Sequence, residues 1–204
     1  MFTNQRFDGW NLKPSTLAGL QELGWENATQ VQRDTVPIAL SGNDVIGQAR
    51  TGSGKTGAFG IPIIESCQPT GKLQALILAP TRELANQVSE EMTAIQGDSG
   101  LVIATVYGGT DIEKQARKLS DGVDVIVGTP GRVMDMTKRK FIDLSSPKIF
   151  CLDEADRMLD MGFFPDITWV IERMTGRQQT LLFSATFPQE ILDAAYEFMN
   201  DPEF

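Results

Sequence analysis

The chain alternates short apolar segments with longer segments of mixed polarity. The apolar segments are rich in β-branched residues and cover residues 44–47, 75–79, 101–107, 123–128, 148–152 and 180–185. Their apolar residues are continuous rather than alternating, which indicates strands buried on both faces, and the intervening segments are long enough for helical crossovers. The pattern therefore predicts an α/β fold, with a mainly parallel sheet and helices on both of its faces.

Several crossovers have the periodicity of helices. In residues 83–96, apolar side chains recur every three or four positions. Further helices are expected over residues 112–119 and 189–199. The 204 residues contain no linker, low-complexity tract or internal repeat, so we expect one domain.

The composition is that of a globular protein, with 41% hydrophobic and 22% charged residues. No stretch approaches the ~18 uninterrupted apolar residues of a membrane span, and the first residues lack the apolar region of a secretory signal. We therefore expect a cytoplasmic protein that does not enter a membrane. Cys67 and Cys151 have no CxxC spacing, so we expect buried thiols rather than a disulfide or a metal site.

The absence of histidine limits the possible chemistry. It removes every Ser/His/Asp or Cys/His mechanism and the commonest zinc ligand, so catalysis must depend on carboxylates and lysine. The 18 basic residues against 27 acidic ones give a formal charge of −9. A polyanion must then bind locally, through backbone amides, helix N-termini and a few arginines, with a shallow salt dependence. The run Lys138-Arg139-Lys140 is expected to be a solvated surface.

A glycine-rich turn follows the first predicted strand and precedes a predicted helix. Glycines allow a ring of backbone N–H groups to surround phosphate, and the helix N-terminus adds positive potential. The lysine of the turn can reach the β- and γ-phosphates of a nucleotide, and the threonine after it can ligate Mg²⁺. The expected nucleotide-binding residues are Thr51, Gly52, Ser53, Gly54, Lys55 and Thr56. The alternative is an ordinary turn with a surface lysine.

Two adjacent acids, Asp153 and Glu154, follow the predicted strand 148–152. Asp153 is expected to hold Mg²⁺ together with Thr56, and Glu154 to orient or deprotonate an attacking water. With Lys55 they form the expected catalytic set. The alternative is that the acids only cap the helix expected over residues 156–161.

These residues spell the sequence Asp153-Glu154-Ala155-Asp156, and the chain resembles the DEAD-box ATP-dependent RNA helicases. The other matching blocks, in the order of the family, are Ala49–Thr56 as phosphate loop, Pro80–Ala85 as motif Ia, Gly108-Gly109, Thr129–Arg132 as motif Ib, Met158–Phe163, and Ser184–Thr186 as motif III. The family's own phosphate loop also explains Ala49, which stands where the general pattern has glycine. The resemblance implies a RecA-like P-loop NTPase domain that uses ATP and Mg²⁺.

Upstream, residues 24–32 resemble the Q motif, which recognises adenine in the family. Trp25, Thr29 and Gln32 match, Ala28 and Gln30 depart from the pattern, and Phe7 lies where an aromatic residue is expected. One glutamine amide can both donate to N7 and accept from N6 of adenine, which predicts a preference for ATP over GTP. Trp25 either stacks on the base or belongs to the core.

The resemblance also implies contacts to the RNA backbone. The implied contact residues are Pro80, Thr81, Arg82, Gly108, Gly109, Thr129, Pro130, Gly131 and Arg132. Hydroxyls, exposed amides and forked arginines suit phosphate and sugar rather than base edges, so binding should not depend on RNA sequence. The alternatives are ordinary turns at the glycines, and arginines paired with acids inside the protein.

Ser184 and Thr186 are expected to bond Asp156 and so couple the nucleotide to the RNA surface; the alternative is that a hydroxyl caps the helix from residue 189. The resemblance implies that residues 1–204 are one N-terminal RecA-like helicase domain, with a Q-motif region near 7–32 and an ATP-binding core near 40–204.

The second RecA-like domain of the family, with the arginines that complete the ATP site, has no counterpart in this sequence. We therefore expect a monomeric domain that is weak or inactive alone and that works with such a second domain in unwinding RNA. The alternatives are an ATP-gated RNA clamp or scaffold with little unwinding, or a P-loop ATPase acting on DNA or unrelated to helicases.

Overall fold

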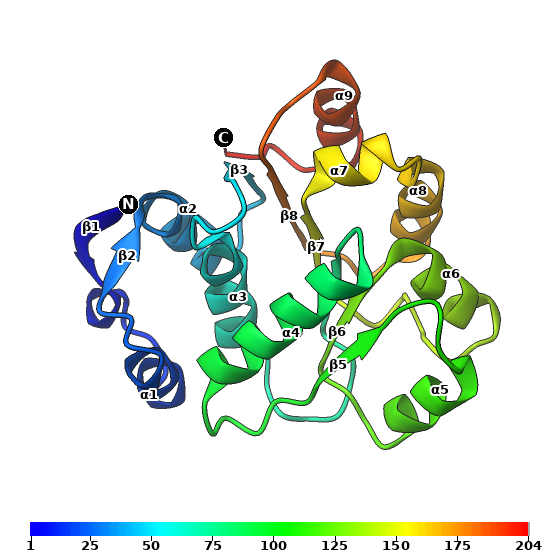
Figure 1. The fold of residues 1–204 in the computed structure, drawn as a ribbon, viewed down its shortest axis with the longest axis horizontal. Coiled ribbons are helices and arrows are strands. Elements are labelled where there is room, and N and C mark those ends of the chain that lie inside the picture. Colours follow the sequence, from blue (N-terminus) through cyan, green and yellow to red (C-terminus); the bar gives the residue numbers. More distant parts are fainter. Residues whose placement is uncertain (204) are drawn as a thin grey trace.

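Six strands form the central sheet of the computed structural model, which describes residues 1–203 (Figure 1). Their order is β3-β8-β7-β4-β6-β5, and every pairing is parallel. The strands are β3 (Val45–Gln48), β4 (Ala75–Leu78), β5 (Ile103–Val106), β6 (Val125–Gly128), β7 (Ile149–Asp153) and β8 (Gln179–Ser184). The predicted parallel α/β fold is confirmed, with each strand inside its predicted segment or within one residue of it.

Helices cover both faces of this sheet (Figure 1). One face packs against α2 (Gln30–Leu40), α3 (Lys55–Ser66) and α4 (Arg82–Gln96), and α1 (Pro14–Glu22) packs on the outside of α4 and α3. The other packs against α5 (Ile112–Ser120), α6 (Pro130–Lys138), α7 (Ala155–Asp160), α8 (Phe164–Arg173) and α9 (Gln189–Phe198). The three helices predicted from periodicity correspond to α4, α5 and α9.

Each strand contributes to two hydrophobic cores. In β4, Ala75 and Ile77 belong to the core under α1–α4, whereas Leu76 and Leu78 belong to the core under α5–α9. All four side chains are fully buried. Successive strand residues point to opposite faces, so a strand covered on both sides must be apolar throughout.

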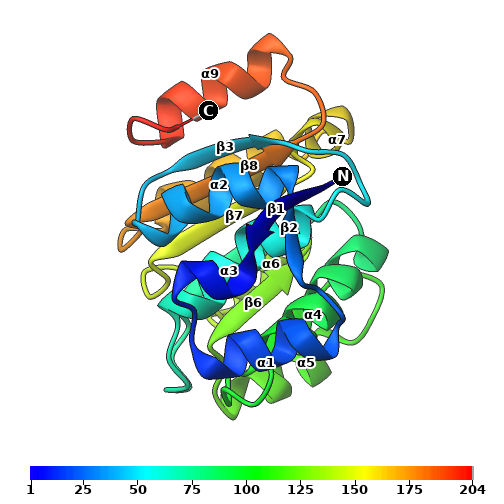
Figure 2. The same cartoon turned by 90° about the vertical axis from the view of Figure 1, so that its left-hand side faces the viewer.

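The first thirty residues form a small unit on the outside of α2, α3 and α4 (Figure 2). β1 (Phe2–Arg6) pairs antiparallel with β2 (Asn27–Thr29), and a short 3₁₀ helix (Phe7–Trp10) and α1 connect them. The hydrophobic pattern did not predict these elements, because both strands are short and only partly buried.

Cys67 and Cys151 are buried and unpaired, as expected. Burial raises the pKa of the Cys67 thiol to about 12, so this thiol stays protonated near neutral pH. None of the helices in residues 1–203 combines the length and the apolar character needed to cross a membrane.

Candidate nucleotide and RNA site

The predicted functional segments meet at one edge of the central sheet. Because its strands are parallel, their carboxyl ends lie at the same edge, where α/β proteins bind ligands. The segments that close or follow these strand ends are residues 49–56, 80–82, 107–109, 129–132, 153–156 and 184–186. Blocks that are far apart in sequence therefore share one surface.

Glycines shape the turn between β3 and α3. Gly52 and Gly54 have φ angles of 82° and 85°, which L side chains rarely adopt. A Cβ on Gly54 would lie 2.7 Å from Thr29 Oγ1 and 2.8 Å from Gln32 Nε2, so the turn packs directly on the Q-motif segment. α3 begins at Lys55, and its first N–H groups and macrodipole favour an anion at this end.

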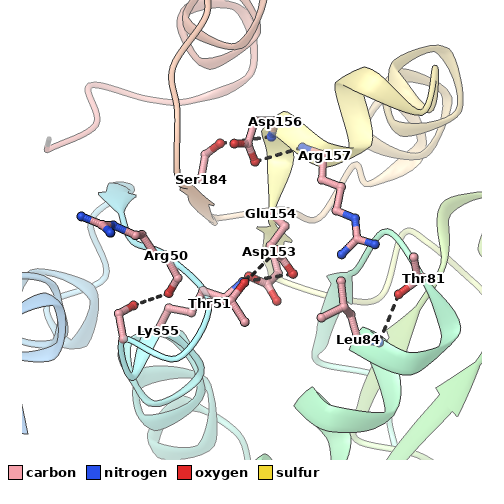
Figure 3. Close-up of polar contacts among 11 residues, drawn as sticks. Arg50, Thr51, Lys55, Thr81, Leu84, Asp153, Glu154, Asp156, Arg157 and Ser184 are labelled. Atoms are coloured by element: carbon pink, nitrogen blue, oxygen red, sulfur yellow. Dashed lines mark hydrogen bonds and ion pairs between the residues drawn. The ribbon is translucent and has the colours of Figure 1, made fainter.

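Lys55 joins this turn to the two acids at the end of β7 (Figure 3). Its Nζ lies 2.7 Å from Asp153 Oδ1 and 3.3 Å from Glu154 Oε2. Only 7% of Lys55 is exposed, so the alternative of a surface lysine is wrong. Burial raises the pKa of Asp153, and the positive charge of Lys55 opposes that rise.

The backbone of Glu154 aims its carboxylate into the site. Glu154 has φ 58° and ψ 53°, a left-handed conformation that is strained for a non-glycine residue and occurs preferentially at functional sites. It stands at the N-cap of α7 without a side-chain capping bond. Instead its Oε1 accepts a hydrogen bond from Thr51 Oγ1 at 3.3 Å. Its buried Oε2 has no hydrogen bond within residues 1–203 and lies 3.3 Å from Lys55 Nζ. The alternative that this acid serves as a helix cap is therefore wrong.

The oxygen donors here suit Mg²⁺ bound together with phosphate. Proteins hold Mg²⁺ through one or two carboxylates, waters and substrate phosphate oxygens. Asp153 and the hydroxyl of Thr56, in the first turn of α3, are such donors and both line one cavity. In residues 1–203 no group of three or more His, Cys, Asp or Glu side chains could hold a metal ion unaided. An ion at Asp153 would take water and phosphate oxygens as its remaining ligands.

A cavity of about 390 Å³ extends from Lys55 and Asp153 to the aromatic residues of the N-terminal unit. That volume lies in the usual range for a small-ligand site. Phe7 and Trp25 line it and stack on each other, with ring centroids 6.3 Å apart. Trp25 also packs against the hydrophobic core, so it lies at the boundary between core and cavity. Stacking of Trp25 on adenine stays a prediction.

Gln32 lines the same cavity but is only 1% exposed. Its Oε1 accepts a hydrogen bond from Thr29 N at 2.9 Å, and its Nε2 donates to Gly54 O at 2.9 Å. One N–H and one lone pair of the amide remain for a base. The adenine contact stays a prediction.

Asp156 connects α7 with the end of β8. Its Oδ2 accepts hydrogen bonds from Thr186 N at 3.1 Å and from Thr186 Oγ1 at 2.8 Å, and its own N–H donates to Ser184 Oγ at 3.1 Å. Burial acts to raise the pKa of Asp156, but hydrogen bonds from Thr186 and its neighbours outweigh it and lower that pKa. α9 has Pro188 at its N-cap with no side-chain capping bond, so the alternative that a hydroxyl caps this helix is wrong.

The implied RNA residues occupy the other half of the carboxyl edge. Arg82 is exposed and lies over the Tyr107 ring, 4.7 Å from its centroid, while Thr81 Oγ1 caps α4 by accepting from Leu84 N. Arg132 donates to Gln115 Oε1 and to Thr110 O, both at 3.0 Å. Neither arginine pairs with an acid in the described part of the chain, so both retain a free positive charge.

The small residues of these blocks differ in accessibility. Gly108, Gly109 and Gly131 are exposed, and a Cβ on any of them would meet nothing within 4 Å. Thr129 is half-buried, and Pro80 and Pro130 are buried. The prolines therefore shape their loops and offer little surface to RNA in this conformation.

Residues 29–194 match the sequence profile of the DEAD/DEAH box helicase family. The chain belongs to this family.

Relatives within the family cover almost all of this chain. It is 46% identical over 199 residues to the DEAD-box ATP-dependent RNA helicase CshA of Streptococcus pneumoniae, which covers 97% of the chain and 38% of that protein. It is 47% identical over 183 residues to the RNA helicase CrhR of Synechocystis, with 90% and 37% covered. The chain thus spans roughly two-fifths of the length of these curated relatives.

The fold of this DEAD/DEAH box chain also matches solved structures. The crystal structure of a DEAD box protein from Methanococcus jannaschii superposes with a TM-score of 0.94 at 41% identity, over 98% of this chain and 55% of that one. A structure described as a hypothetical ATP-dependent RNA helicase from Sulfolobus tokodaii superposes with a TM-score of 0.88 at 38% identity. The prediction of a RecA-like helicase fold is confirmed.

The sequence did not predict that α4 forms one wall of the nucleotide cavity. α4 lines the 390 Å³ cavity through Leu84, Gln87, Val88 and Glu91. Their spacing places them on one helical face, but the apolar members alone explain that face as core. Nothing in the sequence distinguishes a core stripe from a cavity wall. The contact of Tyr107 with Arg82 was also missed, because it joins the residue after β5 to the first residue of α4, and no sequence pattern specifies such a tertiary contact.

Proposed function

We propose that this chain is the first, ATP-binding domain of an ATP-dependent RNA helicase, which couples nucleotide hydrolysis to RNA backbone binding and local strand separation. The observation that carries this proposal is the convergence of Lys55, Asp153 and Glu154 within 3.3 Å at the N-terminus of α3. The relatives named as ATP-dependent RNA helicases support the reaction.

Nucleotide binding would change the partners of Lys55. Its ammonium now neutralises Asp153 and Glu154, and the phosphates of ATP would compete for it. Asp153 and Thr56 would hold Mg²⁺, which when bound offsets the charge of the phosphates. Once free of Lys55, Glu154 can accept a proton from the attacking water. Gln32 and Trp25 would contact adenine at the other end of the cavity.

RNA would bind the half of the carboxyl edge that carries Arg82 and Arg132. The exposed Gly108, Gly109 and Gly131 allow a close approach of the RNA backbone, and the two arginines suit phosphates, so recognition would be independent of base sequence. The hydrogen bonds between Asp156 and Thr186 join the ends of β7 and β8 close to Glu154, and we infer that they help to relay RNA binding to this acid. We infer that a second RecA-like domain supplies further groups to both sites, and that the protein acts as a cytoplasmic monomer.

RNA-stimulated ATP hydrolysis by the full-length protein tests the proposal. Lys55→Ala and Glu154→Gln should each lower kcat about 100-fold or more, because they remove the phosphate contact and the general base. Lys72→Ala and Glu190→Gln, exposed residues outside the site, should leave turnover unchanged. Normal turnover in both site variants would refute the assignment, and equal stimulation by single-stranded DNA would refute RNA as the substrate.

A further inference from the structure

The proposed function leaves one wall of the nucleotide cavity without a role. α4 contributes Gln87 and Glu91, one helical turn apart, beside the apolar Leu84 and Val88. The phosphate-binding turn and Asp153 form one end of this cavity, and Phe7 and Trp25 belong to its aromatic lining. α4 starts at the carboxyl edge of the sheet, and Glu91 lies about 10 Å further along its axis than Leu84.

Glu91 is the one charged side chain among the four residues of this wall. It is half-buried, and its carboxylate has no hydrogen bond or ion pair within residues 1–203. The adjacent Glu90 is exposed and does not line the cavity. A carboxylate oxygen only accepts hydrogen bonds, so the ligand group that suits Glu91 is a hydrogen-bond donor.

ATP offers two kinds of donor to such a carboxylate, the adenine amino group and the ribose hydroxyls. The amino group is assigned to Gln32, whose side chain lines the same cavity. The phosphates are assigned to Lys55 and the glycine turn. The ribose hydroxyls remain, and they belong to the part of the nucleotide that lies between base and phosphates.

We propose that Glu91 accepts a hydrogen bond from a ribose hydroxyl of the bound nucleotide and makes this site selective for ribonucleotides over deoxyribonucleotides. The inference rests on the proposed function, since it requires ATP in the cavity. A contrary effect is expected if no such bond forms: the negative charge of Glu91 would then only repel the triphosphate, and its removal would tighten binding of every nucleotide.

Equilibrium titrations of ATP, 2′-deoxyATP and 3′-deoxyATP into the full-length protein test this, with Mg²⁺ present. The affinity of the unaltered protein for ATP should be at least about ten times its affinity for one or both deoxy analogues, as expected for a hydrogen bond to a charged group. The affinity of Glu91→Ala for ATP should fall to the affinity that the unaltered protein has for that analogue. The affinity for the analogue itself should be the same in the variant and in the unaltered protein. Glu90→Ala should retain the full preference.

Equal affinity of the unaltered protein for all three nucleotides would overturn the inference. So would a preference that survives in Glu91→Ala, or tighter binding of every nucleotide to that variant. Glu91→Gln provides a second variant of unchanged size; it keeps an acceptor oxygen but no charge, so a partial preference is expected. If the unaltered protein binds none of the three, the proposed function itself fails, which distinguishes the two results.

Discussion

At the scale of single residues, the Gln32 side chain links two backbone segments. Its amide bridges the backbone of Thr29 and of Gly54, so the Q-motif segment and the phosphate turn are held together by one side chain. Gly57 is equally close, because a Cβ there would lie 2.5 Å from Gln32 Nε2. A base that bonds the remaining N–H and lone pair of this amide would therefore act directly on the phosphate-binding turn.

Gln32→Ala should weaken ATP binding about tenfold and GTP binding less, because only adenine presents the acceptor and donor that match an amide. Competitive nucleotide titrations measure both affinities. Gln21→Ala, an exposed glutamine on α1, is the control and should change neither. Equal losses of ATP and GTP would show that Gln32 only supports the phosphate turn and does not read the base.

At the scale of elements, α7 and the end of β8 are joined by the hydrogen bonds of Asp156. Two bonds come from Thr186 and one runs from the Asp156 N–H to Ser184 Oγ. α7 begins directly after Glu154, so a shift of the catalytic acid and a shift of residues 184–186 are mechanically connected. This is a local contact between two elements, and its role in coupling is a prediction.

Thr186→Val tests that role, since it removes the hydroxyl donor to Asp156 and keeps the backbone bond. We expect ATP affinity to change less than twofold, while stimulation of hydrolysis by RNA falls about tenfold, within the usual range of coupling between sites. Hydrolysis rates with and without RNA provide the measurement. Thr175→Val, an exposed threonine, should behave as the unaltered protein. Undiminished stimulation in Thr186→Val would contradict the coupling.

At the scale of the whole molecule, several basic side chains lie at the edge where the proposed ligands bind, although the protein is acidic. The chain has a formal net charge of −9, yet Arg50, Lys55, Arg82, Arg132 and Arg157 all lie at or next to strand ends along the carboxyl edge. The basic run 138–140 is exposed at the opposite end of α6, and its Arg139 pairs with Asp135 at 3.3 Å. Binding of polyanions should therefore be local, as expected for a protein without a broad basic face.

The sheet and the motifs at its edge could be predicted from sequence because each rests on a local pattern. Continuous apolar strands predicted the parallel sheet, and parallel strands bring their carboxyl ends together. β1 and β2 escaped prediction because partly exposed strands of five and three residues carry no distinct periodicity. The hydrogen-bond partners of Gln32 and the position of Glu91 in the cavity wall depend on tertiary packing, and no sequence pattern specifies them.

Calorimetric titration of ATP into the full-length protein, with and without Mg²⁺, tests the central claim most directly, namely that Lys55, Asp153 and the glycine turn bind the phosphates of a nucleotide. We predict one ATP per chain, bound more tightly with Mg²⁺, and at least tenfold weaker binding in Lys55→Ala but not in Lys72→Ala. Absence of binding at millimolar ATP and Mg²⁺, or equal affinities of the unaltered protein and Lys55→Ala, would contradict the account.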